Sequence, residues 1–205
     1  MAQPESTSQR TSRYGVHPAF AMQESTLANL KAKTGQSLDE WIKLLEESGP
    51  APEKSRADWL KARHHLGTNV SAWIAERAAG RDPVAEYDPD ALVAAMYAGP
   101  KAALRPVYER LLTLGLELGN DVRACPATTI VPLYRHHVFA ELKPTTRTRI
   151  DLGLALKDTP ATGRLIGTGG LGKGDRVTHR IPVSSLDEID EAVTRWLETA
   201  YDLDA

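Results

Sequence analysis

Residues 138–156, VFAELKPTTRTRIDLGLAL, contain two short runs in which every second residue is apolar. The alternating apolar positions on the two sides of the turn are Val138, Ala140, Leu142, Ile150, Leu152, Leu154 and Leu156. An apolar period of two is typical of strands with one buried face. Residues 138–143 and 149–156 are therefore predicted to form a β-hairpin whose turn begins at Pro144.

Segments on both sides of this hairpin extend the predicted sheet to about four strands. Residues 128–134 form an earlier strand, which Pro132 moves toward an edge of the sheet, and residues 176–183 form a later strand. Apolar side chains recur at helical spacing before the sheet, over residues 101–118 with a continuous helix from about Arg105, and after it, from a capping box at Ser185. The pattern predicts an α+β domain in which helices cover one face of an antiparallel sheet.

The N-terminal half of the chain has helical periodicity only. Capping residues and apolar stripes predict three short helices, which begin near Ser37, Ser55 and Asn69. Each of these helices carries one tryptophan, and a small unit needs such large side chains to build a core. The sequence therefore predicts a small three-helix module.

These patterns divide the chain into four parts. Residues 1–26 are rich in Ser, Thr, Gln and Pro and are predicted to be a disordered tail. Residues 27–80 form the helical module, residues 81–99 form a linker with a connecting helix, and residues 100–205 form the α+β domain.

The composition excludes several classes of protein. No stretch approaches the roughly 20 consecutive apolar residues of a membrane helix, and the first residues lack the apolar run of a secretory signal, so we expect a cytoplasmic protein with no membrane partner. Cys125 is the only cysteine among 205 residues and leaves neither an internal disulfide nor a structural zinc site. The net charge of −2 predicts no general attraction to nucleic acid.

The charge is unevenly distributed along the chain. Residues 135–180 hold nine Lys or Arg against four acids, a balance of +5. Residues 181–205 hold seven acids against Arg195 alone, a balance of −6. The near-neutral net charge is therefore the sum of a basic strand region and an acidic C-terminal helix that follows it.

The open face of the predicted sheet is the expected binding surface. Alternation assigns to it Phe139, Glu141, Lys143, Arg149, Asp151 and Arg180. The candidate ligand-binding residues are Lys143, Arg147, Arg149, Lys173, Arg176 and Arg180. We expect a non-enzymatic binding protein whose partner is nucleic acid or a phosphorylated or carboxylated small molecule. No motif in the sequence requires a cofactor.

Several motifs that suggest other chemistry are incomplete. Residues 167–174, GTGGLGKG, match the start of a phosphate-binding P-loop, but Gly174 stands where that loop needs Ser or Thr, and a strand rather than a helix follows. His179 has the alternation of the apolar residues around it and is predicted to be a hydrogen-bonded core histidine. Cys125 is predicted to be packed rather than nucleophilic. The adjacent histidine pairs lack the spacing of metal ligands, so no metal site is expected.

Two alternative functions stay open. The first is a metal-dependent phosphodiesterase or another hydrolase that uses Glu141, Asp151 or His179. The second is a protein–protein adaptor, in which the helical module contacts a partner. In addition, the acidic helix of residues 186–201 is a candidate to neutralise the basic strands, either within one chain or across a homodimer.

Several blocks of the chain, taken in order, resemble an uncharacterised bacterial family of two parts. They are TGQSLDEWIKLLEESGP, DWLKARHHLGTN, AWIAERAAG, YDPDALVAAMYAGPKAALRPVYERLL, VFAELKPTTRTRIDLGLAL, THRIP and SLDEIDEAVTRWLETAY. The N-terminal half is similar to domain of unknown function family 4287, and the C-terminal half to domain of unknown function family 5655. The resemblance covers about residues 27 to 203. It implies a bacterial cytosolic protein with two parts and supplies no catalytic residues.

Overall fold

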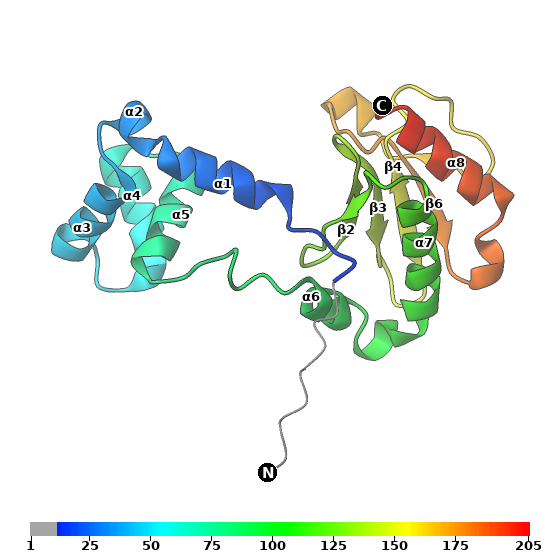
Figure 1. The fold of residues 1–205 in the computed structure, drawn as a ribbon, viewed down its shortest axis with the longest axis horizontal. Coiled ribbons are helices and arrows are strands. Elements are labelled where there is room, and N and C mark those ends of the chain that lie inside the picture. Colours follow the sequence, from blue (N-terminus) through cyan, green and yellow to red (C-terminus); the bar gives the residue numbers. More distant parts are fainter. Residues whose placement is uncertain (1–11) are drawn as a thin grey trace, which may run out of the picture. The chain divides into compact units, whose positions relative to one another are not determined.

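The computed structural model describes residues 12–205, which form two compact units (Figure 1). One unit consists of residues 16–87 and is entirely helical. The other consists of residues 88–205 together with residues 12–15 and contains the whole sheet. The α+β class predicted from the apolar periods is confirmed.

The helical unit contains five α-helices around a small apolar core. They are α1 (Pro18–Ala28), α2 (Leu30–Thr34), α3 (Leu38–Ser48), α4 (Arg56–His64) and α5 (Thr68–Ala78). The core consists of Leu27, Leu30, Trp41, Leu45, Leu60 and Ile74. The capping box predicted at the start of α3 is present, because Ser37 N–H donates to Glu40 Oε2 at 2.6 Å and Glu40 N–H donates to Ser37 Oγ at 3.3 Å.

The expectation of a disordered tail over residues 1–26 does not hold for residues 18–26, which are helical, or for residues 12–15, which contact the sheet. Helix α1 begins at Pro18, and the His17 side chain accepts a hydrogen bond at its start. The helix is stabilised by tertiary contacts, which the sequence does not indicate because this segment has no apolar period. Leu27 enters the core, and Glu24 forms an ion pair with Arg77 of α5. Residues 1–11 of the expected tail lie outside the described residues.

The second unit is a six-stranded antiparallel sheet with helices packed against it. Its elements are α6 (Pro89–Met96), α7 (Arg105–Glu117), β1 (Arg123–Ala124), β2 (Val131–Tyr134), β3 (Val138–Lys143), β4 (Ile150–Leu154), β5 (Ile166–Gly167), β6 (His179–Val183) and α8 (Glu191–Asp202). The strand order is β1-β2-β3-β4-β6-β5. The four longer strands correspond to the predicted ones, while β1 and β5, of two residues each, were not predicted.

Helices α7 and α8 cover one face of this sheet (Figure 1). The strand residues that point toward them are almost fully buried, and include Val131, Leu133, Ala140, Leu142, Ile150, Leu152, Leu154, Ile181 and Val183. Each such Val, Leu or Ile side chain contributes about 1.5–3 kcal/mol of transfer free energy. This layer holds the strands in register and leaves the opposite face of the sheet free to carry polar groups.

A β-bulge in β3 exchanges the faces that the alternation predicts for Val138 and Phe139. Leu133 of β2 pairs with Ala140, but the next residue, Tyr134, pairs with Val138, so Phe139 is an extra residue in β3. Its ring is fully buried on the helix side, 5.6 Å from the ring of Tyr201 in α8. The assignment of Phe139 to the open face was therefore wrong, and Val138 lies on that face instead.

Residues 12–15 lie along strand β1, at one edge of the sheet. Tyr14 forms a parallel bridge with Ala124, and Gly15 N–H donates to the Ala124 carbonyl at 2.8 Å. The Tyr14 ring is buried, with its hydroxyl 2.8 Å from that of Tyr108 in α7. The segment therefore covers an edge that would otherwise present unpaired backbone groups.

The C-terminal helix begins further along the chain than the start predicted at Ser185. The Ser184 N–H donates to Glu188 Oε2 at 2.8 Å, but residues 186–188 form a 3-10 turn, and helix α8 starts at Glu191. Its N-cap is Asp190, which accepts from Val193 N–H at 3.0 Å.

Candidate anion-binding site

Polar side chains of β3, β4 and β6 form two neighbouring rows on the open face of the sheet. In the first row Glu141 lies opposite Gly153, which lies opposite Arg180. In the second row Lys143 lies opposite Asp151. Residues in such cross-strand positions are close enough to interact directly, so the register alone brings two carboxylates and two cations together.

Asp151 is the centre of an ion-pair network on this face. Its carboxylate lies 2.9 Å from Arg149 Nε and 3.3 Å from Arg180 Nη1, and accepts a hydrogen bond from Thr145 Oγ1 at 2.9 Å. Arg149 and Arg180 were both expected to bind a ligand. In the structure their guanidinium groups are already paired with an acid of the same chain.

Arg176 is held by the end of the chain. Its Nε donates to the Val138 carbonyl at 2.9 Å, and its guanidinium forms an ion pair with Asp204. The Asp204 carboxylate is buried and also accepts from the backbone N–H of His137 at 2.8 Å. Burial opposes the ionisation of Asp204, but the His137 hydrogen bonds and the Arg176 charge outweigh it and hold the pKa of this carboxyl below its usual range.

Lys173 lies apart from the other candidate residues. It ends a three-residue 3-10 turn, Leu171–Lys173, in the glycine-rich loop, and its side chain is exposed. The loop is not followed by a helix, and the next regular element is β6. A short turn of this kind lacks the aligned backbone amides of a P-loop.

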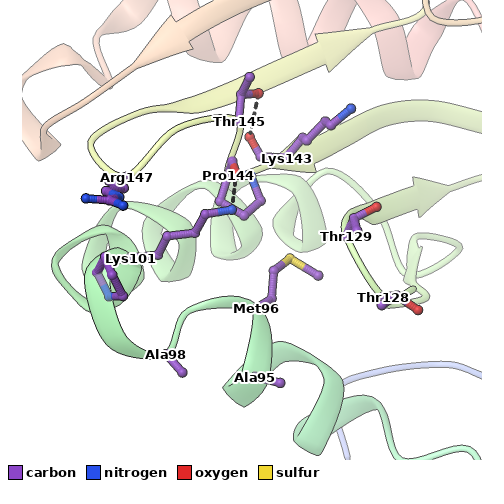
Figure 2. Close-up of a pocket in the computed structure, with 11 residues that line it drawn as sticks. Ala95, Met96, Ala98, Lys101, Thr128, Thr129, Lys143, Pro144, Thr145 and Arg147 are labelled. Atoms are coloured by element: carbon purple, nitrogen blue, oxygen red, sulfur yellow. Dashed lines mark hydrogen bonds between the residues drawn. The ribbon is translucent and has the colours of Figure 1, made fainter.

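A basic hollow of about 520 Å³ lies where the β3–β4 turn meets the end of α6. Its lining residues are Ala95, Met96, Ala98, Pro100, Lys101, Thr128, Thr129, Lys143, Pro144, Thr145 and Arg147, and none of them is acidic. Figure 2 shows Lys101 reaching toward Pro144, with Arg147 at one end of the hollow and Thr128 and Thr129 at the other.

The cations of the basic hollow make few contacts with other residues of the described chain. Lys101 Nζ donates to the Pro144 carbonyl at 2.6 Å. The side chains of Lys143 and Arg147 are exposed and have no hydrogen-bond or ion-pair partner within residues 12–205. Three cations and three threonines therefore line one space that no carboxylate lines, an arrangement that suits the oxygens of an anion.

A second hollow, of about 590 Å³, lies over the open face, and we call it the mixed hollow. Its lining residues are Val138, Glu141, Lys143, Thr145, Asp151, Gly153, Thr168, Asp175, Arg176, Val177 and Arg180. Burial raises the pKa of Glu141, while the charge of Lys143 opposes the rise. Lys143 and Thr145 line both hollows, so the two spaces meet at these side chains.

Comparison with protein families gives two matches. Residues 93–204 match the family described as Domain of unknown function (DUF5655). The chain belongs to this family. Residues 23–78 match Domain of unknown function (DUF4287), so the resemblance of the two halves is confirmed. No curated protein and no solved structure matches the chain. Among the described residues, no helix combines the length and the apolarity that crossing a membrane requires.

The DUF5655 segment carries every residue of both hollows, but only some of them could be predicted from the sequence. Lys143 and Arg147 were predicted from the basic hairpin and line the basic hollow. Lys101, Thr128 and Thr129 were missed, because they come from a 3-10 turn and a loop with no apolar period. The sequence signals near Lys101, the Gly99–Pro100 break before it and the helical spacing after it, indicate structure rather than a binding site.

Acids near the end of the DUF5655 segment neutralise some of its basic residues within the chain. Arg164 lies 3.2 Å from Asp190 and 3.7 Å from Glu188, and Arg176 pairs with Asp204. None of these acids lines the basic hollow. Ion pairs with acids of residues 181–205 therefore involve two of the nine cations of residues 135–180, and only those of Arg164 are made by acids of the expected segment 186–201.

The residues proposed for catalysis have surroundings that suit structural roles. His179 is buried, with Nδ1 2.8 Å from Thr178 Oγ1, which confirms the core histidine. Cys125 is fully buried, and burial raises the pKa of its thiol, which disfavours a reactive thiolate. Within residues 12–205, no three His, Cys, Asp or Glu side chains cluster as metal ligands would.

Proposed function

We propose that the C-terminal unit is a binding module for a phosphorylated small molecule, which it holds in the basic hollow. The observation that supports this proposal is that Lys101, Lys143 and Arg147 line one hollow together with three threonines and no acid. Lysine and arginine bind phosphate oxygens through charge-assisted hydrogen bonds, each worth about 1.5–3 kcal/mol. The hydroxyls of Thr128 and Thr129 can supply further donors, whereas that of Thr145 already donates to Asp151.

The shape of the site favours a small ligand over nucleic acid. The basic hollow has the volume of a small-molecule site, which is typically about 300–1,000 Å³. Proteins that bind single-stranded nucleic acid usually stack its bases on exposed aromatic rings. Phe139, the aromatic residue expected on the open face, is buried under α8 and offers no such platform.

No specific contact favours a metal-dependent phosphodiesterase. Asp151 would have to release two arginines before it could bind a cation, and Glu141 would then be its single carboxylate neighbour on the sheet. We therefore propose binding without catalysis. We place this function in the cytoplasm, where phosphate esters are abundant and where a cysteine outside any disulfide, such as Cys125, stays reduced.

Calorimetric titration of the full chain with pyrophosphate tests the proposal. We expect saturable 1:1 binding that weakens as the salt concentration rises, because part of the affinity is electrostatic. A single-stranded oligonucleotide, titrated under the same conditions, is expected to bind less tightly than pyrophosphate. Absence of saturable pyrophosphate binding at low salt would overturn the proposal, and tighter oligonucleotide binding would replace it by the nucleic-acid alternative.

A further inference from the structure

The two hollows of the C-terminal unit form adjoining parts of one site. Lys143 and Thr145 line both of them, one from the end of β3 and the other from the turn that follows. A ligand with its anionic end among Lys101, Lys143 and Arg147 therefore has its other end beside the mixed hollow. The chemistry of the mixed hollow then indicates what that second end is.

Among the charged side chains of the mixed hollow that have no partner in the described chain, Glu141 is half-buried, whereas Lys143 and Asp175 are exposed. The Glu141 carboxylate makes no hydrogen bond or ion pair with any residue of the described chain, whereas Asp151 on the next strand has three donors. Val177 packs over Gly153, directly opposite Glu141, where a side chain would collide with it. A half-buried carboxylate with no donor loses hydration without compensation, and donors on a ligand would restore it.

The charge balance of the mixed hollow points to neutral donors. Three acids, Glu141, Asp151 and Asp175, stand beside three bases, Lys143, Arg176 and Arg180. Neither a second anion nor an ammonium group has an electrostatic advantage in such a balanced space. Hydroxyl groups can both donate to the Glu141 carboxylate and accept from the neighbouring cations.

We propose that the ligand is the phosphate ester of a polyhydroxy compound, with its phosphate in the basic hollow and its hydroxyl groups at Glu141. This inference rests on the proposed function and names the class of compound that the site takes. Sugar phosphates have this combination of one dianionic end and several neutral donors. Free phosphate would occupy only the basic hollow.

The test compares inorganic phosphate with ribose 5-phosphate by calorimetric titration of the full chain. Ribose 5-phosphate is expected to bind about 10-fold more tightly, as one additional hydrogen bond to a carboxylate would produce. Glu141→Gln is expected to remove most of this preference, because an amide accepts more weakly than a carboxylate. The same variant should bind phosphate as tightly as the natural chain does, or slightly more tightly.

A matched control is Glu198→Gln, at an exposed position on α8, which should preserve the preference for ribose 5-phosphate. Equal affinity of the two ligands for the natural chain would overturn the inference and leave the proposed function standing. Equal weakening of both ligands by Glu141→Gln would overturn it as well. Failure of both ligands to bind would contradict the proposed function itself. Thermal unfolding of each variant shows whether it is folded.

Discussion

Replacing Asp204 by alanine is expected to lower the free energy of unfolding of the C-terminal unit by about 3 kcal/mol. The Asp204 side chain is only 2% exposed and joins three segments that are distant in sequence. It accepts from His137 N–H at 2.8 Å and from His137 Nδ1 at 3.1 Å, and it forms the ion pair with Arg176. Its removal leaves a backbone donor and a guanidinium group without their acceptor.

Urea unfolding, followed by the amide NMR signals of β3 and β4, reports this loss for the C-terminal unit by itself. The control is Asp202→Ala, an exposed acid two residues earlier, which should change the unfolding free energy by less than about 0.5 kcal/mol. Equal effects of the two substitutions would show that the Asp204 contacts contribute no stability.

The stabilisation by Asp204 should depend on pH in a defined direction. The pKa of Asp204 in the folded chain lies below its usual range, despite burial, because of His137 and Arg176. The unfolded state, with its ordinary pKa of about 3.9, therefore binds a proton first as the pH falls. The stabilisation is complete well above that value and is lost as the pH falls through the folded pKa.

Asp204→Asn keeps the shape of the side chain and removes its charge, so it isolates this pH dependence. The difference in unfolding free energy between the natural chain and the variant should shrink as the pH falls below about 4. A difference that grew as the pH fell below about 4 would contradict the assigned direction of the pKa shift.

The double variant Lys101→Ala/Arg147→Ala is expected to weaken pyrophosphate binding by about 100-fold or more. Each substitution removes one charge-assisted contact of about 1.5–3 kcal/mol, and 1.4 kcal/mol corresponds to a factor of ten in affinity. Neither side chain pairs with an acid of the described chain, so no buried charge is left behind. Calorimetric titration measures the change.

The control removes the same charge from elsewhere in the same unit. Lys173→Ala/Arg195→Ala lowers the net charge equally, at a glycine-rich loop and on helix α8, and neither residue lines the two hollows. Its pyrophosphate affinity should stay within about two- to threefold of that of the natural chain. Equal losses in the two double variants would indicate diffuse attraction to the whole surface rather than a site.

Much of the fold could be predicted from short-range patterns. The alternation in residues 138–156 predicted the hairpin of β3 and β4, and the capping box at Ser37 located the start of α3. Both signals depend only on neighbouring residues. The bulge at Phe139 could not be predicted, because the sequence alternates regularly through it and the register against β2 decides which face each residue takes. Helix α1 likewise depends on contacts with α5.

Residues of the candidate site could be predicted only where several basic residues stand close together in the sequence. Lys143 and Arg147 stand in a visibly basic turn, and both line the basic hollow. Arg149 and Arg180 have the same sequence signal, but cross-strand register brings them to Asp151. Lys101 comes from a different segment, 43 positions before Pro144, whose carbonyl it contacts. Which cations are neutralised and which are free is thus a property of the tertiary structure.

Amide chemical shifts of the 15N-labelled chain, recorded during titration with pyrophosphate, show directly whether the basic hollow is the binding site. We predict saturable shifts at Lys101, Thr128, Thr129, Thr145 and Arg147, all of which line the basic hollow. The amides of the glycine-rich loop around Lys173 should be unaffected. Shifts confined to that loop, or the absence of any saturable shift at the five predicted amides, would contradict the account.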